Sequence, residues 1–129
     1  MITNPAPLIS VVDDDESVRD AIQNVLRSAG LRAETFASAE DFLDTGHLED
    51  SDCVVLDIRM PGMSGLQLQR RLADDGYAVP TIFVTAYADE AARHQAIEAG
   101  ASAFLRKPFD PDGLLRSVRS VLSRTRQRQ

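Results

Sequence analysis

The chain has 129 residues, of which 43% are hydrophobic and 26% charged, a composition typical of one globular domain with a normal core. Its net charge is −6, but residues 116–129 hold five arginines and no acid, so the remainder carries 9 basic and 20 acidic residues. This acidic body argues against direct nucleic-acid binding, and the lack of a long apolar stretch or a signal sequence argues against a membrane or secreted protein. The single cysteine, Cys53, cannot form an internal disulfide, and we expect a buried core residue in a reducing, cytoplasmic protein.

The first half of the chain alternates strands and helices. In chain order it predicts a strand at 8–12, a helix at 18–29, a strand at 33–36, a short helix at 38–43 and a polar loop at 45–52. Gly30 is a stop signal for the first helix, and Ser38 with Asp41 forms a capping pair for the second.

The second half continues this alternation. It predicts a strand at 53–56, a loop at 60–65, a helix at 66–76, a strand at 81–84, a weakly patterned helix at 89–99, a strand at 103–105 and a helix at 110–122. Five repeats of strand then helix predict an α/β domain, with a parallel sheet covered by helices on both faces. Ligands bind such sheets beyond the carboxyl ends of the strands.

Polar residues follow four of these strands at that edge. Asp13, Asp14 and Asp15 follow the first strand and Asp57 the third, while Thr85 follows the fourth and Lys107 the fifth. Lys107 is the only lysine in a chain that otherwise uses arginine, which suggests a place that needs a compact ammonium.

These residue types favour phosphoryl transfer. Clustered carboxylates suit a hard divalent cation such as Mg²⁺, whereas neither histidine nor Cys53 is placed to favour zinc. One carboxylate could then act as a nucleophile toward phosphorus and form an aspartyl phosphate. The cation and Lys107 would neutralise charge on the phosphoryl oxygens, and a hydroxyl could bind one of them.

Several motifs occur in a characteristic order and spacing. They lie at residues 11–15, 55–65, 84–86, 99–101 and 104–109. With them, the chain resembles the receiver domain of bacterial two-component response regulators over about residues 8–122. Residues 36–40 and 68–72 are similar to FixJ-like receivers. The resemblance implies a CheY-like, flavodoxin-like fold: a five-stranded parallel sheet in the order 2-1-3-4-5, with five helices on both faces.

The resemblance also implies a ligand set. Asp57 would be the phosphoacceptor, Asp14 would ligate Mg²⁺ directly, and Asp13 would hold the ion mainly through water. Asp57 and the backbone carbonyl of Arg59 would complete the protein ligands, with Mn²⁺ as a substitute ion. Asp15 is left with two interpretations, a supporting member of the acid cluster or a helix cap.

Further roles come from the same resemblance. Lys107 would pair with Asp57 and then with the phosphoryl group, Thr85 would move to bond that group, and Phe104 would be the aromatic switch residue. Phe104 stands where Tyr is frequent in the family. The Lys107–Pro108 bond is expected to be cis, and Gly65 is expected to permit a tight turn near the site.

Two further positions border the expected site. Arg59 lies two residues after Asp57, and Tyr87 lies two residues after Thr85. Bulky side chains at these positions could shield the acyl phosphate from water. The alternative is that both side chains point into solvent.

The predicted function is a phosphorylation switch rather than an enzyme, although the domain would assist its own phosphorylation and dephosphorylation. The expected partners are a sensor histidine kinase or a His phosphotransfer protein, and a phosphorylation-dependent homodimer through helix four, strand five and helix five. A degenerate receiver that only binds proteins is one alternative. A haloacid-dehalogenase-type phosphatase is another, but it needs an aspartate where Arg59 stands.

The domain organisation follows from the same pattern. We predict a single receiver domain over residues 1–129, with 123–129 as a basic tail or the start of a linker. No output domain follows Leu122, so we expect either a stand-alone receiver or part of a longer regulator.

Overall fold

Short apolar runs form the strands of one parallel sheet in the computed structural model, which describes residues 6–46, 48–86 and 90–127. The strands are β1 (Leu8–Val12), β2 (Arg32–Phe36), β3 (Cys53–Asp57), β4 (Thr81–Thr85) and β5 (Ala103–Arg106). The helices are α1 (Glu16–Ser28), α2 (Ala39–Thr45), α3 (Gly65–Asp74), α4 (Glu90–Glu98) and α5 (Pro111–Gln127), with a 3₁₀ turn at Leu48–Asp50.

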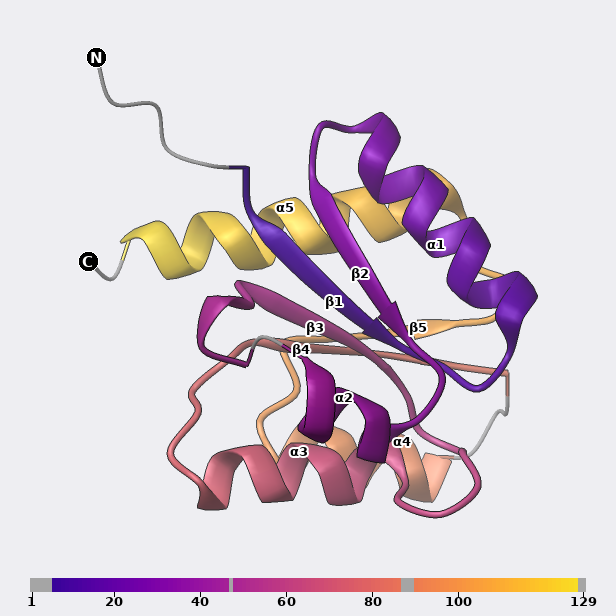
Figure 1. The fold of residues 1–129 in the computed structure, drawn as a ribbon, viewed down its shortest axis with the longest axis vertical. Helices are drawn as coiled ribbons and strands as arrows, with labels where there is room; N and C mark the ends of the chain where they lie inside the picture. Colours follow the sequence, from indigo (N-terminus) through magenta and orange to yellow (C-terminus); the bar gives the residue numbers. More distant parts are fainter. Residues whose placement is uncertain (1–5, 47, 87–89, 128–129) are drawn as a thin grey trace.

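The sheet has the order β2-β1-β3-β4-β5, and every neighbouring pair is parallel (Figure 1). The predicted fold class and strand order are therefore confirmed. The register places the carboxyl ends of the three central strands together, because Val12 pairs with Leu56 and Asp57 pairs with Val84. Whatever follows these strands meets at one edge of the sheet.

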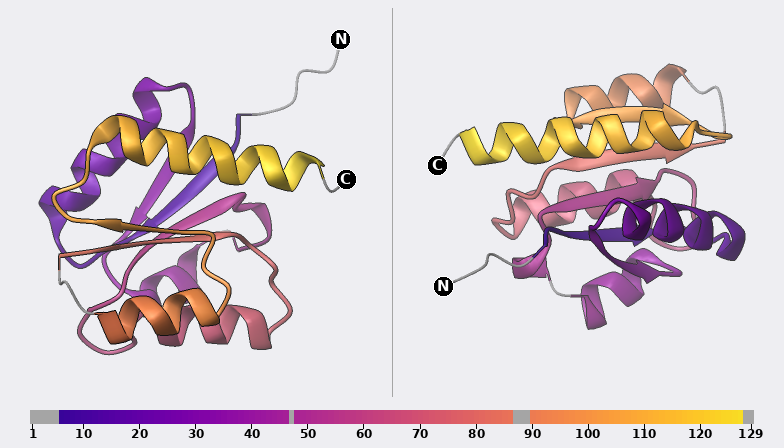
Figure 2. Two further views of the ribbon diagram at one scale, coloured as in Figure 1. Left: turned by 180° about the vertical axis from the view of Figure 1, so that it is seen from behind. Right: turned by 90° about the horizontal axis from the view of Figure 1, so that it is seen from above.

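Helices cover both faces of the sheet in two layers (Figures 1 and 2). On one face, α1 and α5 pack an apolar stripe against the sheet. The buried residues of this stripe are Ile22, Leu26, Leu114, Val118 and Val121. On the other face, α2, α3 and α4 contribute Ala39, Phe42, Leu68, Leu72 and Ala96. Burial of these side chains is the main favourable term that holds the layers together.

Several predicted boundaries differ by a few residues. Asp57 and Thr85 are the last residues of β3 and β4 rather than the first residues of loops. The second helix extends to Thr45, and the 3₁₀ turn at Leu48–Asp50 occupies part of the predicted loop. The last helix continues to Gln127 instead of ending at Leu122, so the first five residues of the predicted tail are helical. Side chains at helix starts explain where the helices begin: Ser38 accepts from the backbone N–H of Asp41, as predicted.

None of the helices in the described part of the chain is long and apolar enough to cross a membrane.

Candidate functional site

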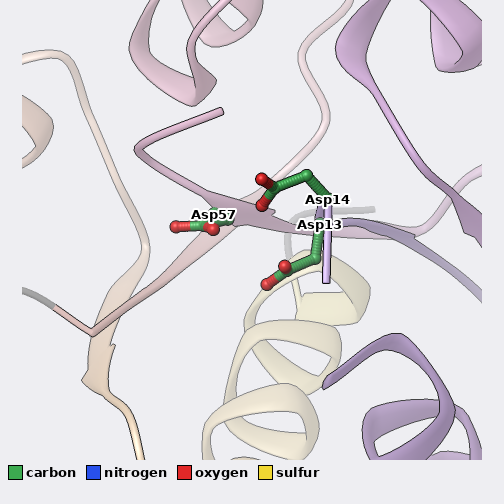
Figure 3. Close-up of side chains that lie close together, drawn as sticks. All are labelled: Asp13, Asp14 and Asp57. Carbon is green, nitrogen blue, oxygen red and sulfur yellow. The ribbon is translucent and has the colours of Figure 1, made fainter. Parts of the chain in front are cut away.

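Three carboxylates meet at the carboxyl edge of the sheet. Asp13 and Asp14 directly follow β1, and Asp57 ends the neighbouring strand β3. Figure 3 shows the Asp13 and Asp14 side chains directed toward Asp57, and one oxygen from each residue lies within 4.8 Å of the others. Asp13 is 1% exposed and Asp57 7%, whereas Asp14 is exposed. The sequence therefore predicted this cluster correctly.

Lys107 reaches the same cluster from the end of β5. Its Nζ lies 2.7 Å from Oδ2 of Asp13 and 3.3 Å from Oδ2 of Asp57. The Lys107–Pro108 peptide bond is cis, as expected, and the backbone N–H of Lys107 donates to the carbonyl of Thr85 at 2.8 Å. One ammonium thus lies between two buried carboxylates.

Burial and charge set the protonation of this pair. Burial, followed by the negative charge of Asp13, raises the pKa of Asp57 to about 6, against an opposing effect of the Lys107 ammonium. Burial lowers the pKa of Lys107, but its hydrogen bond to Asp13 and the charge of Asp57 outweigh that effect and raise it overall. At neutral pH, Lys107 is therefore charged and Asp57 is mostly an ionised carboxylate.

Asp13 is held more tightly than Asp57. Its Oδ1 accepts from the backbone N–H of Asp15 at 2.9 Å and its Oδ2 lies against Lys107, while Nη1 of Arg19 donates to its backbone carbonyl at 2.8 Å. The bonds of the Asp57 carboxylate to Lys107 and to the backbone N–H of Arg59 are longer, at 3.3 Å each. Sequence reasoning missed Arg19, because nothing in the pattern tells where an arginine on the first turns of a helix will fold back.

The side chain of Asp15 caps a helix and does not belong to the carboxylate cluster. It is the N-cap of α1 and accepts from the backbone N–H groups of Ser17, at 2.9 Å, and Val18, at 3.4 Å. Of the two interpretations left open by the sequence, the helix cap is therefore correct. Asp15 contacts the acid cluster through its backbone N–H, which donates to Asp13.

The β3–α3 loop, residues 58–64, follows Asp57 directly. At its end, a Cβ on Gly65 would collide with the carbonyl oxygen of Asp57, so only glycine fits there without displacing the backbone. The requirement is this close approach rather than a left-handed conformation, since Gly65 is not among the glycines with positive φ. Ser64 and Gln67 form a capping box for α3. Their spacing in the sequence is a signal for this helix start, and sequence reasoning missed it.

The structure describes three of the remaining predicted site residues, Thr85, Phe104 and Arg59. Thr85 is 2% exposed at the end of β4, one residue beyond the partner of Asp57 in the register. Phe104 is partly buried in β5 and packs on the α2–α3–α4 side of the sheet. Arg59 is exposed at the start of the β3–α3 loop, and Tyr87 lies outside the described residues.

The donor set fits a hard divalent cation. Three carboxylates offer oxygen ligands within reach of one another, and the Lys107 ammonium by itself does not balance their negative charge. Two of the three carboxylates are buried side by side, and a bound cation would lower the cost of keeping both of them charged.

Comparison with known proteins identifies the class. Residues 9–119 match the response regulator receiver domain family, and the chain belongs to this family. It is 44% identical over 125 residues to the transcriptional regulatory protein TdiR of Thauera aromatica, covering 97% of this chain and 55% of TdiR. It is 39% identical over 117 residues to FixJ of Azorhizobium caulinodans, covering 91% of this chain and 56% of FixJ.

A solved structure gives the same result. The response regulator receiver protein from Burkholderia phymatum is 48% identical, with a TM-score of 0.80 over 91% of this chain and 95% of that one. Receivers of this family are signalling domains that interact with histidine kinases and bind Mg²⁺ in an acidic pocket. The chain spans about half the length of the curated relatives above, 55% of TdiR and 56% of FixJ.

Proposed function

We propose that Asp57 accepts a phosphoryl group from a phosphohistidine of a sensor kinase or a His phosphotransfer protein. An oxygen of Asp57 attacks phosphorus, the N–P bond of the phosphohistidine breaks, and the imidazole leaves with the bonding electrons and takes up a proton. The product is an acyl phosphate on β3.

The observation that carries this assignment is the difference between the two buried carboxylates. Both oxygens of Asp13 are engaged at 2.7–2.9 Å, whereas the contacts of Asp57 with the Lys107 ammonium and the Arg59 N–H are both 3.3 Å long. A nucleophile needs a lone pair free to form the new bond, and Asp57 meets this requirement better than Asp13.

The metal ligands follow from the same arrangement. Asp13, Asp14 and Asp57 would hold Mg²⁺, or Mn²⁺ in its place, together with the backbone carbonyl of Arg59. When bound, the cation neutralises charge on the phosphoryl oxygens. Asp13 lies deeper than Asp14, which supports a direct contact for Asp14 and a water-mediated one for Asp13.

Phosphorylation would act as a switch through three residues. Lys107 shifts from Asp57 to a phosphoryl oxygen, the hydroxyl of Thr85 donates to another, and Phe104 follows Thr85 inward. Thr85 and Phe104 are both on strands next to α4, so their movement changes the surface formed by α4, β5 and α5. This surface would dock a partner or form a phosphorylation-dependent homodimer.

The setting of the domain belongs to the same proposal. Residues 1–129 would form one receiver unit that acts in the cytoplasm beside its kinase, and the basic end of α5, which continues to Gln127, would lead into a linker. TdiR is a transcriptional regulator, which supports a regulatory output for the protein in which this receiver acts. Catalysis is limited to assisting its own phosphorylation and dephosphorylation, with Arg59 and Tyr87 affecting how long the acyl phosphate lasts.

The test is direct phosphorylation. Wild-type protein incubated with Mg²⁺ and acetyl phosphate should gain the mass of one phosphoryl group, and hydroxylamine should remove it. EDTA and Asp57→Asn should each abolish the gain. Labile phosphorylation of Asp57→Asn at the wild-type level would disprove the assignment. Failure of the wild type both to accept a phosphoryl group and to bind beryllofluoride would remove the switch function itself.

A further inference from the structure

The two ends of the β3–α3 loop are fixed by hydrogen bonds within the loop and to the first turn of α3. The N–H of Gly65 donates to the carbonyl of Ile58 at 3.0 Å, which closes the loop. The capping box adds a bond of 2.8 Å from the N–H of Ser64 to Gln67 Oε1 and one of 3.2 Å from the N–H of Gln67 to Ser64 Oγ. These three bonds engage the ends of the loop and not its middle, residues 61–63.

A side chain from another helix reaches that middle part. Oε2 of Glu40, in the first turn of α2, accepts from the backbone N–H of Met63 at 3.2 Å, across 23 residues of sequence. Gly62 has a φ of +75°, and a Cβ on it would lie 2.5 Å from the same Oε2 atom. The carboxylate therefore lies directly against the loop backbone, in space that a larger residue at position 62 would occupy.

The topology explains why Glu40 can reach the loop. Phe36, the last residue of β2, pairs with Val12, the last residue of β1, so α2 starts at the same carboxyl edge as the acid cluster. The N-cap Ser38 fixes the first turn of α2, and Glu40 follows two residues later.

We propose that Glu40 is a positioning residue for the metal site, acting through the β3–α3 loop. The inference rests on the proposed function, in which the backbone carbonyl of Arg59 is a metal ligand. A backbone ligand can be placed only by placing the backbone itself, and the hydrogen bond from Met63 to Glu40 restricts the loop four residues beyond Arg59. Groups that orient metal ligands in this way commonly affect affinity although they never touch the ion.

Glu40 acts on the loop through its hydrogen bond to Met63 and not through the electric field of its negative charge. Glu40 is exposed, so its charge is screened by water and salt. A neutral glutamine keeps a carbonyl oxygen that can accept the Met63 N–H, whereas alanine removes the acceptor. Glu40→Gln and Glu40→Ala therefore separate the bond from the charge.

The first measurement is Mg²⁺ affinity by titration calorimetry on the full chain. Glu40→Ala should weaken binding about 3- to 10-fold, the size of effect expected for the loss of one hydrogen bond, and Glu40→Gln should stay within about twofold of wild type. Asp41→Ala is the matched control, because it removes a carboxylate from the same turn while the hydrogen bonds of Asp41 to Ser38 and Thr45 come from its backbone. It should bind Mg²⁺ as the wild type does.

The second measurement needs no metal. In Mg²⁺-free protein, amide hydrogen exchange at Met63 should be faster in Glu40→Ala than in wild type, and unchanged in Asp41→Ala, with the denaturation midpoint nearly the same in all three. A merely stabilising side chain would shift the midpoint and would not select this one amide.

Gly62→Ala gives an independent variant. Its Cβ pushes on the Glu40 carboxylate, and alanine is also strained at a φ of +75° in either background. Gly62→Ala should therefore weaken Mg²⁺ binding in wild type and weaken it less in Glu40→Ala, as a double-mutant cycle measures. Additive effects would show that the two positions act separately and would overturn the inference.

Two failures are distinguishable. If wild type binds Mg²⁺ and is phosphorylated while Glu40→Ala matches it in affinity and in Met63 exchange, the positioning role is wrong and the proposed function stands. Equal losses in Glu40→Gln and Glu40→Ala would also overturn it, since charge would then be the cause. If wild-type protein does not bind Mg²⁺, the proposed function and this inference fail together.

Discussion

The two ends of β3 each bury a titratable group, and the two groups behave differently. Cys53 begins the strand with no exposed surface, and burial, with the nearby charge of Asp52, raises the pKa of its thiol to about 12. Asp57 ends the strand at 7% exposure with a pKa of about 6. Burial opposes the charged form at both ends, but Asp57 has the Lys107 ammonium beside it, whereas Cys53 is affected by the negative charge of Asp52.

With Asp57 as the proposed nucleophile, the two ends of β3 indicate what makes a buried group reactive. At the amino end, the thiol is neutral and packed against the α1–α5 side of the core. At the carboxyl end, the carboxylate lies at the opening where loops replace the strand, and Lys107 compensates part of its charge. A buried nucleophile therefore needs both an ionised form and an open edge, and the two conditions can be tested separately.

The largest expected effect concerns Cys53. At pH 8, an aromatic disulfide reagent should modify its thiol on the order of 1,000-fold more slowly in the folded protein than in guanidinium, because reaction requires opening of the core. Absorbance of the released thiolate measures the rate, and denatured protein, which has one cysteine per chain, provides the full amplitude. Rapid modification of the native protein would mean that this end of β3 is accessible, and the contrast with Asp57 would be lost.

The next largest effect concerns Lys107. Lys107→Ala should slow phosphorylation by acetyl phosphate about 100-fold, because the charge that compensates Asp57 and the incoming phosphoryl group is gone. Lys107→Arg should recover only part of the rate, since a planar guanidinium does not fit a space shaped around a compact ammonium. Initial rates from intact mass measure this, with circular dichroism to confirm folding. A wild-type rate in Lys107→Ala would show that Lys107 is only a structural counter-charge.

Much of this arrangement could be predicted from the sequence. Apolar runs that end in Asp13, Asp57 and Thr85 indicate parallel strands, and strand ends converge at one edge by topology alone. Lys107, the only lysine of the chain, indicated a positively charged side chain at the same edge. Each of these features can be recognised from a few neighbouring residues, and the topology of a parallel sheet is enough to bring them to one edge.

The remaining contacts depend on tertiary distances that no local pattern encodes. Lys107 lies closer to Asp13 than to Asp57, 2.7 against 3.3 Å, which the order of the strands does not determine. Glu40 reaches Met63 across 23 residues, and an exposed glutamate in a first helical turn gives no sign of that. Asp15 could be a cap or a metal-site acid, because an aspartate suits both until its side chain is placed.

A smaller effect is the cost that Asp57 imposes on stability. Asp57→Asn removes a carboxylate whose charged form is disfavoured by burial, so at pH 7.5 without Mg²⁺ it should raise the free energy of unfolding by about 1–2 kcal/mol. Urea denaturation followed by circular dichroism measures it. A destabilised Asp57→Asn would show that the Lys107 contact outweighs the burial penalty.

The stability difference between Asp57→Asn and the wild type should depend on pH. The pKa of Asp57 is raised from 3.8 to about 6 on folding, so its protonated form stabilises the fold below about pH 4, and this contribution is lost as the pH rises through about 6. The advantage of Asp57→Asn should therefore shrink between pH 6 and pH 4. Mg²⁺ should shrink it as well at pH 7.5, because the cation binds the three carboxylates of the wild type more tightly than the two that remain in Asp57→Asn.

The smallest expected effect separates two carboxylates that are adjacent in sequence. Asp15→Ala should lower the free energy of unfolding by about 1 kcal/mol, because the N–H groups of Ser17 and Val18 lose their cap, while Mg²⁺ affinity changes little. Asp14→Ala should do the reverse and weaken Mg²⁺ binding with nearly unchanged stability, since Asp14 is exposed and belongs to the carboxylate cluster. Urea midpoints and calorimetric Mg²⁺ titrations on both variants measure this crossing pattern. Loss of Mg²⁺ binding in Asp15→Ala at the level of Asp14→Ala would place Asp15 in the metal site and extend the reactive end of the sheet to a third carboxylate after β1.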